Sequence, residues 1–569
     1  MKWIFSNTNP KLVLSIQAQY RISPIMASIL AERGLLSTDE TNSFFDPNLN
    51  LLHDPFLMKN MNQAVKRIIN AIKRDESIMV FGDYDVDGTT AASILYIGLL
   101  NMGANVSTYI PNREKEGYGI SDLGIDTAKK RKAKLIITCD CGTNDFDHVD
   151  YANASGIDVI ITDHHTPGDN LPNAIAILNP KQKDCEYPFK ELCGGGVAIK
   201  LLTGLIYALK LSFNLVYDLF DLAALGTSAD LVPMIDENRI IVYHGLKVLR
   251  ESDRPGLREL LKVAGVDINH TVSVGQVVFN VAPRINAAGR LGDANRSVQL
   301  LTTRDKAFAK EVALDLDNEN KRRQLIQSQV VEEAMLKVNA EVDLKKDHAI
   351  VLGSHNWHAG VVGIAASKLK ESFHRPTIII GFDQEGNGKG SARSISKLNM
   401  YDALKKSSAQ LVNYGGHPMA AGLSLHSNNF ETFRSEFLSH VENQLTQKDF
   451  EPTIYLDSEI KLEEINTRFM TFLEKLSPFG PKNMRPKFGA FHLSVDGIPK
   501  IIGNGDHIRF KVKSGNKSFP VIGFNLAHKY EDLINKQPID LAFVIEINRW
   551  RGQETIQLNA RDIRPSNFA

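Results

Sequence analysis

The chain has 569 residues, of which 43% are hydrophobic and 23% charged, and this length corresponds to about three to five globular domains. Lys and Arg number 66 in total, as do Asp and Glu, so the formal net charge is 0. This balance excludes a histone-like polycation and an acidic disordered chain, although it allows local basic grooves. No apolar run reaches the about 18–20 residues of a membrane helix, and Met1–Pro10 lacks the layout of a secretory signal. We therefore expect a cytoplasmic protein that does not contact a membrane.

The four cysteines are too few for a disulfide framework in a chain of this length. Cys139 and Cys141 flank Asp140, and Cys185 and Cys193 follow, but their spacing lacks the paired C-x-x-C pattern of a zinc site. We expect Cys139 to point into the core rather than to bind a metal.

Short apolar runs rich in β-branched residues predict buried strands in the first half of the chain. These runs are Ile78–Phe81, Leu135–Thr138 and Val159–Thr162, and helical stretches lie at residues 89–102, 121–132 and 147–155. Such alternation is typical of an α/β fold whose parallel sheet is covered on both faces. We expect this sheet in a domain over residues 53–300, preceded by a helical extension over residues 1–52.

A segment without Gly or Pro runs from Lys306 to Ala340, with apolar residues at helical spacing. It predicts one helix about 50 Å long, which we expect to connect two lobes within residues 301–345. A second, smaller α/β domain is expected over residues 346–448, with strands at 349–352 and 377–381.

The final region, residues 449–569, has a different character. Ile508–Lys513 alternates apolar and basic residues, which predicts a half-buried strand with a positive outer face. Further strands are expected at residues 519–524, 541–548 and 555–558. Residues 487–569 hold 12 Lys and Arg against 8 Asp and Glu, a local charge of +4. We interpret this region as a small basic β-barrel.

Acidic and histidine residues follow each predicted strand of the first sheet. They are Asp83, Asp85 and Asp87 after the first strand, Asp140 after the second, and Asp163, His164 and His165 after the third. Carboxyl ends of parallel strands meet at one edge, about 4.8 Å apart. Alternating carboxylates repel one another unless a cation neutralises them, and carboxylate with imidazole suits Mn²⁺ or another first-row ion. The pattern predicts two ions about 3.5–4 Å apart, with Asp230 completing the second ion's ligands from a fourth segment.

Each motif alone also has an ordinary structural explanation. The Asp83–Gly88 loop could be solvated or hold Ca²⁺ loosely. An Asp that closes a strand is commonly a helix N-cap, and a His-His pair is often a packing residue. The occurrence of all three motifs at successive strand ends favours the metal centre.

The motifs resemble those of a known superfamily. The segments Asp83–Gly88, Asp140–Gly142, Asp163–His165 and Asp230 are similar to the four ordered motifs of the DHH phosphoesterases. Three further segments, Arg284–Arg290, Gly390–Ser394 and Gly415–Pro418, resemble the RecJ family of bacterial single-strand-specific DNA exonucleases. The resemblance implies a parallel-sheet DHH catalytic domain, a DHH-associated substrate-binding α/β domain and a C-terminal OB-like barrel.

Site roles follow from this chemistry and from the resemblance. The expected ligands of two Mn²⁺ or Mg²⁺ ions are Asp83, Asp85, Asp87, Asp140, His164 and Asp230. His165 is a candidate for phosphate binding or acid catalysis, and Asp163 for orienting the ligands. The expected substrate-binding residues are Arg113, Arg290, Ser391, Arg393 and a turn formed by Gly415, Gly416 and His417. The expected nucleic-acid platform on the barrel comprises Arg509, Lys511, Lys513, Arg549, Trp550 and Arg551.

The resemblance implies a single-stranded-DNA-specific 5′→3′ exonuclease that releases 5′ mononucleotides by two-metal catalysis. It also implies work in DNA repair and recombination beside single-strand-binding protein and a helicase, and we expect a monomer. Two alternatives stay open. One is a DHH phosphodiesterase acting on short oligonucleotides or cyclic dinucleotides, and the other is a non-catalytic scaffold that binds single-stranded DNA.

Overall fold

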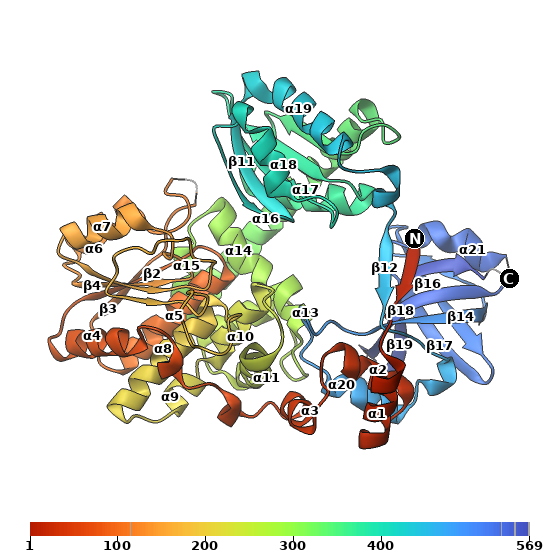
Figure 1. The fold of residues 1–569 in the computed structure, drawn as a ribbon, viewed down its shortest axis with the longest axis horizontal. Coiled ribbons are helices and arrows are strands. Elements are labelled where there is room, and N and C mark those ends of the chain that lie inside the picture. The colour runs from red at the N-terminus through yellow and green to blue at the C-terminus, as the bar shows by residue number, and fades with distance from the viewer. Residues whose placement is uncertain (114, 536, 551–552, 567–569) are drawn as a thin grey trace.

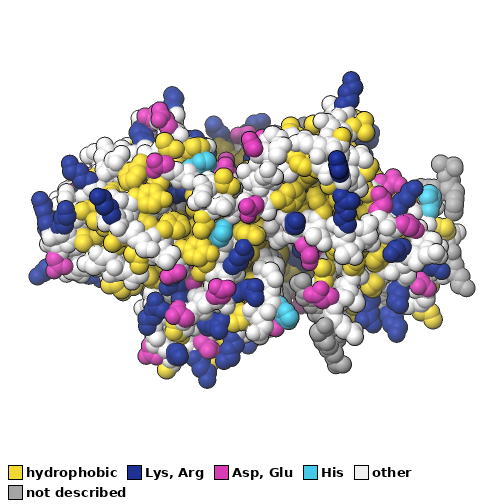
Figure 2. All heavy atoms as spheres, turned by 90° about the horizontal axis from the view of Figure 1, so that it is seen from below, with side chains coloured by type: hydrophobic (Ala, Val, Ile, Leu, Met, Phe, Trp, Pro, Cys, Tyr) yellow, Lys and Arg dark blue, Asp and Glu magenta, His cyan; other side chains and the backbone are white. Residues whose placement is uncertain are grey.

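The computed structural model describes residues 1–113, 115–535, 537–550 and 553–566, with no side-chain description at 291, 549 and 550. The chain forms three lobes, which Figure 1 shows at the left, the top and the right. Within the described residues, every helix is too short or too polar to cross a bilayer. On the face drawn in Figure 2, Lys and Arg side chains are interspersed with Asp and Glu, in keeping with the net charge of 0.

The first lobe is built on a parallel sheet, as predicted. Its strand order is β3-β2-β4-β5-β6, and the register joins Ile78 to Leu135 and Ile137 to Ile160. The strands are β2 (Ile78–Gly82), β3 (Val106–Tyr109), β4 (Leu135–Cys139), β5 (Asp158–Thr162) and β6 (Ala176–Leu178). All residues of β2 and β4 are buried, because helices cover both faces of the sheet.

Two hydrophobic clusters fill the space between the sheet and its helices. The helices α4 (Met61–Lys73), α5 (Val86–Asn101) and α8 (Gly194–Leu209) pack on one face. The helices α6 (Asp122–Lys130) and α7 (Phe146–Ala154) pack on the other. The lobe continues through α9 (Asn214–Tyr217), α10 (Phe220–Ala229), α11 (Asp236–Glu251), α12 (Pro255–Val263), α13 (Val274–Gln276), η3 (Val277–Val281), α14 (Ala282–Leu291) and α15 (Asn295–Thr302).

The long helix predicted from sequence is α16 (Lys306–Glu341), which has 36 residues. Its first half buries Val312 and Leu316 in the core of the first lobe. Its second half buries Val330 and Val338 against the second lobe. The helix therefore joins these two lobes, as the sequence predicted.

The second lobe is a smaller α/β unit with the mixed strand order β10-β11-β9-β8-β7. Its strands are β7 (Ile350–Ser354), β8 (Thr377–Phe382), β9 (Asn387–Arg393), β10 (Asn413–His417) and β11 (Ala420–His426), and its helices are α17 (Ala359–Phe373), α18 (Met400–Lys406) and α19 (Phe430–Glu442). One prediction was wrong here. Gly415, Gly416 and His417 form strand rather than turn, because they pair with β11, and the chain reverses after them.

The third lobe is a ring of strands in the order β13-β14-β18-β19-β17-β16-β15, closed by pairing of β14 with β16. The strands are β13 (Ser458–Glu459), β14 (Lys487–Val495), β15 (Lys500–Ile502), β16 (His507–Ser514), β17 (Lys517–Gly523), β18 (Ile539–Trp550) and β19 (Gln553–Pro565), with α20 (Thr467–Lys475) and α21 (Tyr530–Ile534). Along β16 the apolar side chains are buried and the basic ones exposed, which confirms the predicted alternation.

The N-terminal segment packs on this third lobe, which also contains β19, the last described strand (Figure 1). Strand β1 (Lys2–Phe5) runs parallel to β12 (Thr453–Leu456), and Trp3 Nε1 donates a 2.8 Å hydrogen bond to Asp562. The helices α1 (Pro10–Tyr20), α2 (Pro24–Glu32) and α3 (Thr38–Phe45) share the hydrophobic core of the barrel. The helices were predicted, whereas the strand and its distant partner were not.

Arg239 of α11 links the first lobe to the third. Its guanidinium donates hydrogen bonds to the carbonyl oxygens of Phe44 and of residues 475–478, at the end of α20. The free carbonyls at a helix end suit a cation, and this buried arginine supplies one. The link holds the barrel against the sheet domain.

Candidate active site

Three neighbouring strands bring acidic side chains to one edge of the first sheet. Asp83 follows β2, Asp140 follows β4, and Asp163 and His164 follow β5. Because β2, β4 and β5 are adjacent and parallel, these residues meet at the carboxyl edge, where such sheets bind ligands. Asp140 adopts the left-handed backbone conformation (φ 62°), which a short polar residue tolerates. The sequence predicted this convergence.

The start of α5 adds two carboxylates to the same edge. Asp85 caps the helix and accepts a 3.0 Å hydrogen bond from the Gly88 amide. A Cβ at Gly88 would lie 2.6 Å from the Asp83 carbonyl oxygen, so only glycine fits beneath the acidic loop. Asp87 accepts hydrogen bonds from the amides of Gly194 (2.5 Å) and Gly195 (2.9 Å), the first residues of α8. The N-terminus of α8 therefore fixes the Asp87 carboxylate.

His164 lies at the centre of the cluster. Its Nε2 is 2.9 Å from Asp140 Oδ1, 3.6 Å from Asp230 Oδ2 and 3.9 Å from Asp87 Oδ2. Asp230, at the end of α10, thus joins the three strand-end motifs from a separate segment, as the sequence predicted.

The ligand atoms fall into three overlapping groups whose members all lie within 4.8 Å of one another. The groups are Asp83 with Asp85 and Asp140, Asp87 with His164 and Asp230, and Asp140 with His164 and His165. The first two groups together contain all six predicted ligands. Asp140 belongs to the group with Asp83 and also to the group with His164, so it lies between the two sets of ligands. Among the described residues, no such group includes a cysteine.

Burial and mutual repulsion perturb these carboxyl groups. Burial, and then the neighbouring Asp85, raises the pKa of Asp83 to about 8. Burial, and then Asp87, raises the pKa of Asp230 to about 8 and that of Asp140 well above its usual range. Burial lowers the pKa of His164, which keeps the imidazole neutral with a lone pair available. The ionised form of the cluster therefore requires a positive charge to stabilise it.

Several buried atoms of the cluster also lack a hydrogen bond of good geometry to any described residue. They are Asp83 Oδ1, Asp140 Oδ1, Asp230 Oδ2 and both ring nitrogens of His164. Buried polar atoms are rarely left unsatisfied unless a ligand or water takes them. A set of five carboxylates and one neutral imidazole fits two divalent ions such as Mn²⁺ or Mg²⁺.

His165 and Asp163 form a pair beside the cluster. Asp163 accepts hydrogen bonds from His165 Nδ1 (2.8 Å) and from the Thr143 amide (3.0 Å). Burial alone raises the pKa of Asp163, but these hydrogen bonds outweigh it and lower that pKa. For His165 the signs are reversed: burial alone lowers its pKa, but the hydrogen bond to Asp163 outweighs burial and raises the pKa. Asp163 therefore orients the His165 ring and favours its protonated form.

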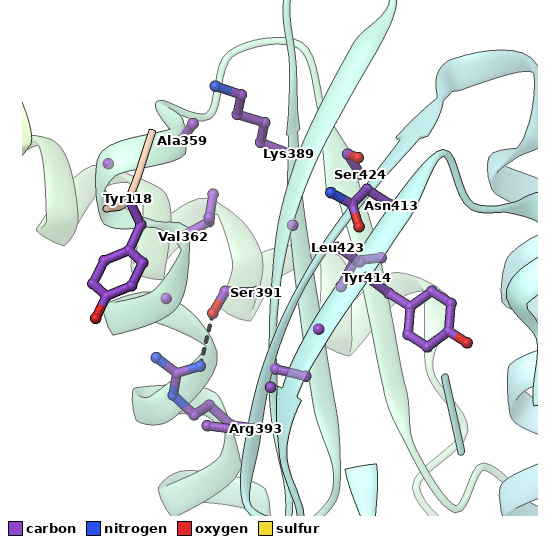
Figure 3. Close-up of a pocket in the computed structure, with 18 of the residues that line it drawn as sticks. Tyr118, Ala359, Val362, Lys389, Ser391, Arg393, Asn413, Tyr414, Leu423 and Ser424 are labelled. Atoms are coloured by element: carbon purple, nitrogen blue, oxygen red, sulfur yellow. Dashed lines mark hydrogen bonds between the residues drawn. The ribbon is translucent and has the colours of Figure 1, made fainter. Parts of the chain in front are cut away.

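An open cleft of about 940 Å³ lies between this site and the second lobe. Arg113 and Arg290 line it from the first lobe. Ser391 and Arg393 line it from β9, as Figure 3 shows. Arg393 Nη1 donates a 2.7 Å hydrogen bond to Ser391 Oγ, drawn as a dashed line. Burial, and then the nearby Arg113, lowers the pKa of Arg290 to about 10. Such a gathering of guanidinium groups suits a phosphorylated ligand.

Comparisons with known proteins agree with this geometry. Residues 77–227 match the DHH family, N-terminal domain, residues 346–443 the DHHA1 domain, and residues 456–562 the RecJ OB domain. The chain is 39% identical over 569 residues to the single-stranded-DNA-specific exonuclease RecJ of Bacillus subtilis, covering 100% of this chain and 71% of that protein. It is 33% identical to the Escherichia coli RecJ of the same name, covering 96% of both chains.

A solved structure agrees as well. The crystal structure of Thermus thermophilus RecJ in complex with Mn²⁺ superposes with a TM-score of 0.83 at 28% identity, covering 100% of this chain and 80% of that one. The chain belongs to the RecJ family.

The remaining RecJ-type site predictions fall in different places. Gly415 and Gly416 line the cleft, whereas His417 ends β10 outside that lining. Arg509, Lys511 and Lys513 are exposed on β16 of the barrel. The predicted platform side chains of Arg549 and Trp550, and the whole of Arg551, lie outside the described residues.

Two features of this RecJ-family site were missed from sequence. Gly194 and Gly195 anchor Asp87, and a run of three glycines opening an apolar helix could have indicated an anion-binding helix start. Tyr118 lines the cleft, and its hydroxyl donates a 3.0 Å hydrogen bond to the Asp140 carbonyl oxygen. No local pattern marks this loop tyrosine.

Proposed function

We propose that this RecJ-family protein is a metal-dependent exonuclease that digests single-stranded DNA from the 5′ end and releases 5′ mononucleotides. The observation that carries this proposal is the meeting of six ligand side chains at one sheet edge, beside a cleft lined with arginines. The named relatives are single-stranded-DNA-specific exonucleases.

Two divalent ions, Mn²⁺ or Mg²⁺, would be held by six residues, with Asp140 as the ligand common to both positions: Asp83, Asp85, Asp87, Asp140, His164 and Asp230. When bound, two such ions supply an activated water and neutralise charge on the phosphoryl oxygens. The relatives of known structure include RecJ proteins in complex with Mn²⁺ and with Mg²⁺. Gly194 and Gly195 keep Asp87 aimed at the centre of this site.

His165 acts on the scissile phosphate from the edge of the metal centre. Asp163 orients its ring and favours the protonated form, so that the imidazolium donates a hydrogen bond to a phosphoryl oxygen or a proton to the leaving 3′ oxygen. Asp163 serves as a positioning residue in this account.

The cleft determines the direction of digestion. Arg113, Ser391 and Arg393 bind the terminal 5′ phosphate through paired hydrogen bonds, and Arg290 contacts the adjacent backbone. Gly415 and Gly416 let the strand pass close to the sheet of the second lobe, with His417 at its edge. Recognition of a 5′ phosphate at a fixed distance from the metals gives 5′→3′ polarity and release of one nucleotide at a time.

The barrel acts as the platform over which the strand approaches. Arg509, Lys511 and Lys513 present positive charge on β16, and Arg549, Trp550 and Arg551 remain predicted members of this platform. A cleft that admits one strand excludes duplex DNA, which gives the strand selectivity.

Cellular partners follow from the substrate. A nuclease restricted to single strands needs a helicase to unwind duplex DNA, and it works on strands coated by single-strand-binding protein, in repair and recombination. The relatives named above are bacterial, and bacterial DNA lies in the cytoplasm, where we place this protein. We propose that the protein is a monomer, as expected from the sequence.

Digestion of a 5′-phosphorylated single-stranded oligonucleotide in Mn²⁺ tests the proposal. Asp140→Ala removes the shared ligand and is expected to abolish mononucleotide release, while the exposed control Asp169→Ala retains it. Normal digestion by Asp140→Ala would refute the assignment. A preference for a dinucleotide over a long strand would favour the short-oligonucleotide phosphodiesterase instead, and binding without digestion by the wild type would favour the scaffold.

A further inference from the structure

The cleft extends along the sheet of the second lobe beyond Ser391 and Arg393. Strands β9, β11 and β10 lie side by side, and residues of all three line the cleft. Because successive side chains of a strand point to opposite faces, residues two apart on these strands share one face. Ser391 stands in the middle cross-strand row with Gly422 and Gly415. The next row, farther from Arg393, consists of Lys389, Ser424 and Asn413. All three line the cleft, and no role has yet been given to them (Figure 3).

The two glycines of the middle row keep the floor of the cleft flat. A Cβ at Gly415 or Gly422 would meet no atom within 4 Å, and neither residue has a positive φ. The fold itself therefore requires glycine at neither position. Side chains there would instead stand in the open cleft, beside Ser391 and one row away from Ser424 and Asn413. The flat floor thus leaves room for a ligand that reaches from one row to the next.

The outer row offers hydrogen-bond donors and positive charge that the protein leaves unused. Within the described part of the chain, the side chains of Lys389, Ser424 and Asn413 make neither a hydrogen bond nor an ion pair. Tyr414, on the same strand as Asn413, also borders the cleft, but its ring points to the other face of the sheet and packs against the core of the second lobe (Figure 3). The row therefore has an ammonium, a hydroxyl and an amide but no stacking surface, which suits an anion better than a base.

We propose that this outer row binds the additional phosphates of a strand whose 5′ end carries a di- or triphosphate. The inference rests on the proposed function, because it places the first 5′ phosphate at Ser391 and Arg393. Lys389 lies two residues from Ser391 along β9, an advance of about 6.6 Å that two further phosphates can bridge, and the two glycines leave the floor open toward Ser424 and Asn413. Lys389 neutralises the added charge, and Ser424 and Asn413 donate hydrogen bonds to the outer oxygens.

The reaction at such an end is the same phosphodiester hydrolysis, but the released nucleotide carries one or two more phosphates. The oxygen of water bonds to the phosphorus that joins the first two nucleosides, and the bond from this phosphorus to the 3′ oxygen of the first nucleoside breaks. That 3′ oxygen takes a proton. The products are a nucleoside 5′-triphosphate and a strand shortened by one residue that carries a 5′ monophosphate. The oxidation states do not change, and no co-reactant besides water is needed.

Initial digestion of three oligodeoxynucleotides of one sequence tests the proposal. They carry a 5′ hydroxyl, a 5′ monophosphate or a 5′ triphosphate, and the first product is identified by chromatography. The variant Lys389→Met keeps the length of the side chain and removes its charge. The matched control Lys405→Met changes an exposed lysine on α18 of the same lobe, away from the cleft lining.

We expect the wild type to release a nucleoside triphosphate from the triphosphorylated strand. In Lys389→Met, the ratio of kcat/KM for the triphosphorylated strand to that for the monophosphorylated strand falls about tenfold, the value of one charge-assisted contact. The ratio stays unchanged in Lys405→Met. The proposal is overturned if the wild type rejects the triphosphorylated strand, or if Lys389→Met leaves the ratio unchanged. A wild type that does not digest the monophosphorylated strand refutes the proposed function itself.

Discussion

Asp83→Asn changes the charge of the acidic cluster while preserving its shape, and it tests whether the metal-free site is strained by repulsion. The pKa of Asp83 is raised from 3.8 to about 8, first by burial and then by Asp85. A carboxyl with a higher pKa in the folded state binds its proton more tightly there than when unfolded. The stability that this gives is present at low pH and is lost as pH rises from about 4 to about 8.

The shift sets an upper limit on the effect. A difference of about four pKa units corresponds to at most about 6 kcal/mol between low pH and pH 8. Even a third of this, about 2 kcal/mol, moves the melting temperature of a lobe of this size by about 4–8 °C. We therefore expect metal-free Asp83→Asn to melt at least about 4 °C above the metal-free wild type at pH 8, and about a third of that margin above it at pH 5.

Thermal unfolding in EDTA, followed by circular dichroism at pH 5 and pH 8, measures this difference. Adding Mn²⁺ is expected to raise the melting temperature of the wild type strongly at pH 8 and that of Asp83→Asn much less, because the variant lacks one ligand. Asp169→Asn, which changes an exposed carboxylate away from the cluster, serves as the matched control. An Asp83→Asn variant that gains no stability at pH 8, or equal stability at both pH values, would contradict the reasoning.

Three further predictions concern other parts of the molecule. Lys200→Met leaves the fully buried Glu237 carboxylate without its ion-pair partner, and we expect urea titrations to show a free energy of unfolding lower by about 3–5 kcal/mol. A loss below about 1 kcal/mol would be inconsistent with a buried ion pair. The Glu116 carboxylate accepts hydrogen bonds from the Asn112 backbone amide (2.7 Å) and from the hydroxyls of Tyr109 and Ser121, so Glu116→Ala frees the loop that carries Arg113. We expect KM for a 5′-phosphorylated strand to rise about tenfold, and an equal rise for a 5′-hydroxyl strand would show that the loop does not act through the 5′ phosphate. Binding of single-stranded DNA should weaken steeply with salt, and Lys511→Ala should reduce the slope of log K against log salt by about 1, whereas an unchanged slope would exclude Lys511 from the platform.

The sequence predicted the parts of this fold that depend on local periodicity. The strands β2, β4 and β5, the helix α16 and the alternation along β16 all lie within a few residues of their predicted positions. The acidic cluster was predictable for a related reason, because parallel strands bring their carboxyl ends to one edge. Once β2, β4 and β5 are predicted as parallel strands of one sheet, Asp83, Asp140 and His164 are expected to lie at the same edge.

The missed features depend on contacts between distant segments. The pairing of β1 with β12 joins residues about 450 positions apart, and its short strands carry no signal of their partner. Gly415 and Gly416 read as a turn because glycine usually marks one, whereas here β11 supplies the strand partner. Arg239 similarly gives no local sign that it will bind the carbonyl oxygens at the end of α20.

The central claim is that one cluster of side chains holds two divalent ions. Crystals soaked in Mn²⁺, with data collected at the manganese absorption edge, test it most directly. The account predicts two anomalous peaks about 3.5–4 Å apart, ligated by Asp83, Asp85, Asp87, Asp140, His164 and Asp230. Peaks located elsewhere, or a fully soaked crystal without a peak between these side chains, would contradict it.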